Sequence, residues 1–409
     1  MTSLALITGS QSFESFTDAE GIASVARFVV YPALLAAWWS LGIRRRRERT
    51  TRWDWGKVLP LAMTAWFALG AFLAEDRIGS LARAAALCLL ILISVAVLGP
   101  SLGTTRFATT LFAAGFLAAL VTAVLAAIAP LVSSNPNWGL LGNRYYGPLS
   151  ATRLGPICAV GWMAGYAFAR TAPRRRIRLL AFVGIFLLLA MTVISRARGS
   201  YLCLGVGMVI FFVLSRRSGV VRRIGMVAAV GGVLAVGAWG WSVTVTDSSF
   251  ARFLRLDQED MVAQRVDIWR AMGTLWLERP LFGVGLGNEA ELSEFAKRSH
   301  SVVLSTLNEG GLPGLLLLLG ALAVASTRAL RLALSPVDER LRLVGTLALA
   351  VIVGNFVLGF VETTFINAAS TSNMYLWLVA GAAMAAANDV NVHRQLRRPT
   401  APTRRCVSP

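Results

Sequence analysis

Residues 264–314 read QRVDIWRAMGTLWLERPLFGVGLGNEAELSEFAKRSHSVVLSTLNEGGLPG, and this stretch lies between two long apolar segments. It opens with the spacing of an amphipathic helix, passes a proline and three alternating glycines, and reaches His300 where the next apolar segment begins. At about 100° per residue, one arc of the first helix is apolar and contains Val262, Val266, Trp269, Met272, Gly273 and Trp276. The stretch therefore predicts an amphipathic helix, a turn and then a membrane-spanning helix.

Arg265 lies within that apolar arc and not on the polar side of the helix. An unpaired charge on an apolar face is costly, so an arginine there needs an anionic partner. A snorkelling side chain or a structural ion pair is the alternative explanation. Arg265 is therefore a candidate anion-binding residue.

The composition predicts an all-α, polytopic transmembrane bundle. Of 409 residues, 56% are hydrophobic, and the mean hydropathy is +0.63. Apolar segments near the length of a membrane span recur without the two-residue alternation of a β-barrel. The net charge of +19 comes almost entirely from arginines, most of them in short links between these segments, so orientation in the membrane explains it better than nucleic-acid binding. The four cysteines show no disulfide framework, and we expect no cleavable signal peptide.

About eleven spans are predicted in one membrane domain. They cover residues 22–43, 57–74, 81–99, 107–129, 151–169, 179–194, 201–214, 224–246, 301–327, 343–361 and 371–387. Basic clusters at 44–52, 170–178 and 216–223 follow alternate spans, which predicts a cytoplasmic (inner or plasma) membrane protein with its N-terminus outside. The expected parts are helices 1–8 over 1–246, an extracytoplasmic loop with the amphipathic helix over 247–299, helices 9–11 over 300–387, and a cytoplasmic tail over 388–409.

Positive residues predicted on the outer side oppose insertion, so each of them needs another explanation. Arg144 lies in GNRYYGP (142–148), and both Arg196 and Arg198 lie in SRARGS (195–200). Guanidinium groups match the geometry of phosphate oxygens with paired donors. These residues, with Arg265, predict an anion-binding surface at the outer side.

His300 and Glu309 are ionisable residues at the start of the span 301–327. The helix dipole and the neighbouring Lys297 and Arg298 disfavour a charged imidazolium, so we expect the neutral imidazole that a general base requires. A capping or interfacial histidine is the alternative. Glu309 lies deeper in the span, where a carboxylate is either functional or paired structurally with an arginine.

The pattern GVGLG, with Gly283, Gly285 and Gly287, could expose backbone N–H groups to a phosphate or form a plain turn. It neither follows a strand nor opens a βαβ unit, which excludes a dinucleotide fingerprint. The chain has no P-loop, HExxH or Ser-His-Asp signature, and its histidines and carboxylates lack the spacing of a metal site. We therefore expect neither a metal nor a cofactor.

Taken together, these segments resemble the O-antigen ligase and polymerase superfamily of bacterial polysaccharide enzymes. The resemblance is carried by SRARGSYLCLGVG (195–207), RVDIW (265–269), RPLFGVGLGN (279–288) and HSVVLSTLNEGGLPG (300–314), in family order over about 190–315. GNRYYGPLS (142–150) is similar to the family's arginine-bearing loop. Ser301 stands where the family usually has asparagine, and ligases commonly have twelve spans.

The resemblance implies a metal-independent, inverting glycosyltransferase that uses an undecaprenyl-diphosphate-linked glycan as donor. In that reaction a glycan or lipid-glycan acceptor hydroxyl attacks the anomeric carbon, and the lipid diphosphate leaves. We expect His300 to be the base and Arg265, with Arg196 or Arg198, to stabilise the diphosphate. Arg144 would contact donor phosphate or sugar, and Glu309 would be a support residue.

Two other functions remain open at this point. A polymerase would use the same donor but transfer the glycan to another lipid-linked repeat, and the sequence does not separate it from a ligase. A transporter of lipid-linked sugars would carry basic residues along the bundle interior, whereas here they cluster in the outer loops.

Overall fold

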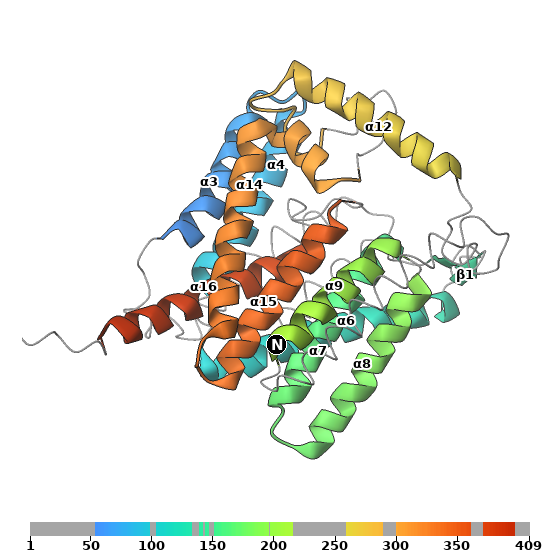
Figure 1. Cartoon of the computed structure of the whole chain (residues 1–409). Coiled ribbons are helices and arrows are strands. Elements are labelled where there is room, and N and C mark those ends of the chain that lie inside the picture. The colour runs from blue at the N-terminus through green and yellow to red at the C-terminus, as the bar shows by residue number, and fades with distance from the viewer. Residues whose placement is uncertain are drawn as a thin grey trace, which may run out of the picture.

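The computed structural model describes residues 54–98, 104–132, 139–141, 144–146, 151–195, 197–215, 259–288, 300–360 and 371–396, and these are almost entirely helical (Figure 1). Nine predicted spans coincide with described helices, whereas the predicted spans 22–43 and 224–246 lie outside the described residues. The helices at these spans are α3 (Trp55–Ala71), α4 (Arg77–Ile91) continued by the π-helix η2 (Leu92–Leu98), α6 (Thr105–Val132), α7 (Ala151–Thr171), α8 (Arg175–Ser195), α9 (Arg198–Ser215), α14 (Val302–Leu334), α15 (Glu339–Leu358) and α16 (Thr371–Leu396). The predicted amphipathic helix is α12 (Glu259–Glu278), which lies across one end of the bundle (Figure 1).

Several of these helices are suited to a lipid environment. Within the described residues, five helical stretches are long and apolar enough to cross a membrane: 77–95, 107–128, 175–195, 302–334 and 339–358. In α8, the side that faces away from the bundle is as apolar as the buried side and exposes Leu180, Val183 and Phe186. A helix that is apolar all round fits lipid contact, and the chain is therefore a multi-pass membrane protein.

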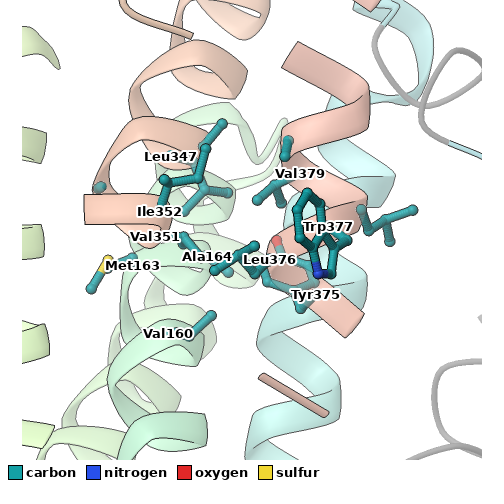
Figure 2. Packing of buried hydrophobic residues seen from close by; sticks show 14 of the residues in the cluster. Val160, Met163, Ala164, Leu347, Val351, Ile352, Tyr375, Leu376, Trp377 and Val379 are labelled. Atoms are coloured by element: carbon teal, nitrogen blue, oxygen red, sulfur yellow. The ribbon is translucent and has the colours of Figure 1, made fainter. Parts of the chain in front are cut away.

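The core lies where α7, α15 and α16 meet. Residues 373–387 of α16 are all buried, and Trp377 is fully enclosed. Figure 2 shows labelled side chains of the three helices meeting in one cluster, among them Val160, Leu347 and Leu376. The Tyr375 hydroxyl donates to the carbonyl oxygen of Leu111 in α6 at 3.2 Å, so α6 is also attached to this core.

A short β-hairpin interrupts the helical order between α6 and α7. Strand β1 (Gly139–Leu141) pairs antiparallel with β2 (Arg144–Tyr146), and Leu141 lies opposite Arg144. The described secondary structure is helical, as predicted, apart from these two strands, which are only three residues long each and were not predicted. The hairpin contacts α7 and α8, and it places Arg144 at the end of the bundle where α7 begins and α8 ends.

The opposite end of the bundle is fastened by two ion pairs. Asp54 precedes α3 and accepts from the Arg328 guanidinium at 2.9 Å and from the Asn388 amide, which joins α3, α14 and α16. Arg170 at the end of α7 pairs with Glu339 at the start of α15. All these groups lie at or near segments predicted to be cytoplasmic, so segments assigned to the same side do lie at the same end.

Candidate active site

The helix that follows His300 is broken at Gly311, two residues after Glu309. Ser301 is its N-terminal cap with an extended backbone, and the helix runs from Val302 to a non-helical residue, Gly311, with φ of 67° and ψ of −173°. Pro313 follows two residues later. This backbone conformation is essentially restricted to glycine. The break leaves a separate first segment, 302–310, which carries Glu309 near its end.

The turn after α12 is inserted into the hydrogen-bond ladder at this break. In an unbroken helix, Leu312 N–H would donate to the Asn308 carbonyl oxygen. Instead, Leu312 N–H donates to Pro280 O at 2.8 Å, and Asn308 O accepts from Val284 N–H at 2.6 Å. Two bonds to the turn thus replace one bond within the helix, and the buried backbone groups of the break are satisfied.

Glycines allow the close approach of the two segments. A Cβ placed on Gly283 would lie 2.2 Å from Asn308 O, and one placed on Gly311 would lie 2.0 Å from Leu281 O. Glu309 is only 8% exposed, and its Oε1 accepts a hydrogen bond from Gly287 N–H at 2.9 Å. The motifs RPLFGVGLGN and NEGGLPG therefore form one interlocked unit, which we call the loop–break unit (residues 279–288 and 308–313).

Helices α3 and α4 attach the loop–break unit to the bundle. The Trp66 indole N–H of α3 donates to Gly310 O at 2.8 Å, and its ring stacks on Phe282 with centroids 4.7 Å apart. From α4, Ser80 Oγ and Arg83 Nη1 both donate to Leu286 O, at 3.1 Å and 3.0 Å. None of these three anchoring residues was singled out from the sequence, although Arg83 is a charge inside an apolar span.

These contacts decide between the two interpretations of GVGLG. The N–H groups of Gly283, Val284, Gly287 and Asn288 already donate to protein acceptors, namely Arg279 O, Asn308 O, Glu309 Oε1 and Gly285 O. The three glycines have φ values of 67°, 89° and 84°. The plain-turn interpretation is thus confirmed, and the phosphate-cradle interpretation is wrong for these donors because they are occupied. Glu309 accepts a hydrogen bond from this turn, and its role as a support residue of the site stays a prediction.

His300 lies immediately before the N-terminal cap of α14 and is exposed. Its backbone has a φ of 49°, in the left-handed region that non-glycine residues seldom adopt, histidine being among the more tolerant. Next to it, Val302 N–H donates to Gly359 O at the end of α15, at 2.6 Å. The predicted position of His300 at a helix N-terminus is therefore confirmed. The bond to Gly359 fixes the start of α14 relative to the end of α15.

The register between α9 and α15 brings the SRARGS turn to the same level. A Cβ on Gly207 would lie 3.6 Å from Ala350 O, and one on Gly354 would lie 2.9 Å from Cys203 O. These contacts make the two helices antiparallel, because the residue number falls in α9 as it rises in α15. The same register places the backbone of Arg198 level with Gly359, the residue that accepts from Val302.

The turn between α8 and α9 also packs against the start of α7. A Cβ on Gly155 would lie 2.2 Å from Ser200 Oγ and 2.7 Å from Ser195 Oγ, so only glycine fits there. Strand β2, which contains Arg144, contacts both α7 and α8. The structure therefore gathers the backbone of Arg144, Arg198 and His300 at one end of the bundle; their phosphate-binding roles remain predictions, and Arg196 lies outside the described residues.

The backbone position of Arg265 lies on the face of α12 that contains Ile268 and Met272, and this face differs from the predicted arc. Ile268 and Met272 are 4% and 0% exposed, whereas Val266 and Trp269 are each 38% exposed. Arg265 is three residues before Ile268 and seven before Met272, a spacing that puts its backbone position on the same face. The structure describes no more of Arg265 than its backbone. The predicted arc was wrong for Val266 and Trp269 because a helical wheel does not show which neighbours cover a helix.

Comparison with known proteins agrees with the geometry. Residues 183–319 match the family model described as O-Antigen ligase. The match contains the SRARGS turn, α12, the turn 279–288 and the first segment of α14, and it supports the resemblance to the O-antigen ligase and polymerase superfamily. No curated protein matches the chain. The matched family, with the apolar helices, indicates a multi-pass membrane protein of polysaccharide biosynthesis.

Proposed function

We propose that the protein is an O-antigen ligase-like glycosyltransferase acting at the outer side of the cytoplasmic membrane. It moves a glycan from an undecaprenyl-diphosphate-linked donor to an acceptor hydroxyl. The observation that supports this best is the coincidence of the family match at 183–319 with segments that meet at one end of the bundle. Motifs more than ninety residues apart in the chain thus reach one place.

The reaction can be assigned to residues of this chain. The imidazole of His300 removes the proton from the acceptor hydroxyl, and the oxygen attacks the anomeric carbon. The bond from that carbon to the phosphate oxygen breaks, and undecaprenyl diphosphate leaves with the bonding electron pair. In-line attack inverts the anomeric centre. Exposure of His300 just before the start of α14 lets an acceptor reach it.

Negative charge on the leaving diphosphate needs stabilisation by cations, which arginines supply in place of a metal ion. We assign this role to Arg265 and to Arg196 or Arg198, with Arg144 on donor phosphate or sugar. A guanidinium binds two phosphate oxygens at once, which a lysine cannot do. Glu309 has no part in the bond-making step in this assignment, because it accepts from the amide of Gly287.

A deletion strain tests the function directly through its surface glycans. If the protein is the ligase, whole chains accumulate on the lipid carrier and are absent from the acceptor. Loss of long chains with retention of single repeats would show a polymerase instead. Unchanged glycans together with blocked passage of lipid-linked sugar across the membrane would overturn the enzymatic assignment. Complementation with His300→Gln, which keeps a hydrogen-bonding side chain but no base, separates catalysis from the mere presence of the protein.

A further inference from the structure

Arg83 is a charged residue inside one of the helical stretches with the length and composition of a membrane span, 77–95. It lies near the end of the second turn of α4, and its side chain is exposed. Nη1 donates to Leu286 O at 3.0 Å and to Asn288 Oδ1 at 3.4 Å. Both acceptors are uncharged, so these bonds orient the guanidinium against the loop–break unit without neutralising it.

Two other arginines at this end of the bundle have carboxylate partners. Arg279 pairs with Glu75 at 3.2 Å, and Arg270 pairs with Asp267 at 3.3 Å. Within the part of the chain that the structure describes, no carboxylate lies within ion-pair distance of Arg83. An arginine in a membrane-spanning segment is costly and usually marks a functional site or an ion pair. Because no described carboxylate provides the ion pair, we take an anionic ligand as the better explanation.

The geometry leaves the binding edge of Arg83 available. Nη1 makes both of its hydrogen bonds, while Nε and Nη2 retain the remaining N–H donors of the planar fork. These two nitrogens form the edge that binds two oxygens of one phosphate. The exposure of the side chain allows a phosphate carried on a lipid to reach this edge from the membrane without separating the helices.

We propose that Arg83 binds a phosphate of the lipid-linked donor beside the loop–break unit, an inference that rests on the proposed function. The Gly287 N–H beside Arg83 donates to Glu309, and Glu309 lies nine residues, or roughly 13.5 Å at 1.5 Å per residue, along α14 from His300. Arg83 is thus set apart from the reacting hydroxyl and inside a span. The phosphate it binds is the one joined to the prenyl chain, and the phosphate next to the sugar lies nearer His300.

A purely structural role for Arg83 would be to fasten the turn 279–288 to α4. Ser80 provides the matched control, because its hydroxyl donates to the same Leu286 carbonyl oxygen and carries no charge. If fastening is the only role, Ser80→Ala and Arg83→Gln should behave alike. If Arg83 binds phosphate, the two variants should differ in every measurement that depends on an anion.

The test measures thermal unfolding of full-length protein in neutral-lipid nanodiscs, titrated with inorganic pyrophosphate. We expect pyrophosphate to stabilise the wild type and Ser80→Ala, and to bind Arg83→Gln about 10- to 100-fold more weakly, the usual loss for a charged hydrogen bond. A second arm replaces part of the neutral lipid with phosphatidylglycerol. Stabilisation by this lipid without any by pyrophosphate would overturn the donor assignment and identify a headgroup site.

Turnover with a lipid-linked glycan separates this inference from the proposed function. We expect Arg83→Gln to raise the KM for the donor about 10-fold or more while kcat changes less, and Arg83→Lys to recover only part of the loss. Equal pyrophosphate affinity in wild type and Arg83→Gln would refute the role of Arg83 even if the enzyme is active. An inactive wild type that still binds pyrophosphate through Arg83 would refute the glycosyltransferase assignment and leave the phosphate site intact.

Discussion

Replacing Gly311 with alanine should disrupt the loop–break unit. The φ of 67° and ψ of −173° put the residue in a region that costs a non-glycine residue about 1–3 kcal/mol. The added Cβ would lie 2.0 Å from Leu281 O and 2.7 Å from Pro280 O, so backbone and not a flexible side chain has to move. That movement breaks the bond from Leu312 N–H to Pro280 O and displaces the neighbouring bond to Asn308, at about 1 kcal/mol each. The total destabilisation is about 3–5 kcal/mol.

Gly320→Ala is the matched control, because Gly320 lies in the same helix and a Cβ there meets only Leu59 side-chain atoms at 3.6 Å and beyond. Alanine in a helix interior is favoured over glycine, so this variant should be neutral or slightly more stable. Thermal unfolding in detergent reports global stability, and amide hydrogen exchange over residues 279–288 reports the turn itself. We expect Gly311→Ala to lower Tm by many degrees and to accelerate exchange in this turn. Wild-type exchange there, with an unchanged Tm, would refute the interlock.

Substitutions at four other residues test separate contacts and roles. Glu309→Gln keeps an acceptor oxygen but loses the charge, so it should lower Tm slightly, with a loss of about 1 kcal/mol, whereas Glu309→Ala should speed hydrogen exchange of the turn; identical exchange in both would deny the contact. Burial raises the pKa of the Asp54 carboxyl, but the hydrogen bond and the charge of Arg328 outweigh burial and hold this pKa below its ordinary value of 3.8. The stabilisation of the folded state by this ion pair is therefore fully present above pH 3.8 and is lost as the pH falls through the lowered pKa. The difference in Tm between the wild type and Asp54→Asn should accordingly disappear in acid. His300→Gln should reduce turnover about 10²–10⁴-fold with donor binding retained, and normal turnover would exclude a histidine base. Arg265→Lys should fail nearly as badly as Arg265→Ala at normal protein levels, while full activity of the lysine variant would exclude paired phosphate binding.

Hydropathy located the helices but not their ends. The predicted span at 81–99 begins after the charged first turn, whereas α4 begins at Arg77 because Asp76 caps it through Gly79 N–H. Likewise, α15 begins at Glu339 behind the cap Asp338, ahead of the predicted start at 343. Charged caps and first turns belong to the helix but lower the local hydropathy, so a span predicted from hydropathy starts several residues after the helix does. Polar residues at the C-terminal end of α16 shorten the predicted span in the same way, to 387, whereas the helix ends at Leu396.

The sequence predicted which residues belong to the candidate site better than it predicted the contacts between them. The position of His300 at a helix start followed from where the apolar span begins. The break at Gly311 was missed, because the span 301–327 reads as continuous by hydropathy despite the sequence Gly-Gly-Leu-Pro. The partner of Glu309 was also missed. A carboxylate in a span suggests an arginine, and nothing local indicates the amide of Gly287, which is 22 residues earlier.

The short segment 302–310 is held at both of its ends, and this would keep His300, the base in the proposed reaction, in a defined position. At its start, Val302 N–H is bonded to Gly359 O of α15, which blocks sliding along the bundle. At its end, Gly310 O accepts from Trp66 of α3, and Glu309 accepts from the turn after α12. Because unsatisfied backbone groups are costly in lipid, the break is stable only while that turn occupies it. The position of His300 therefore depends on contacts with α15 and with the loop–break unit. If His300 is the base, as proposed, a change in the turn after α12 should lower turnover without any substitution of the histidine.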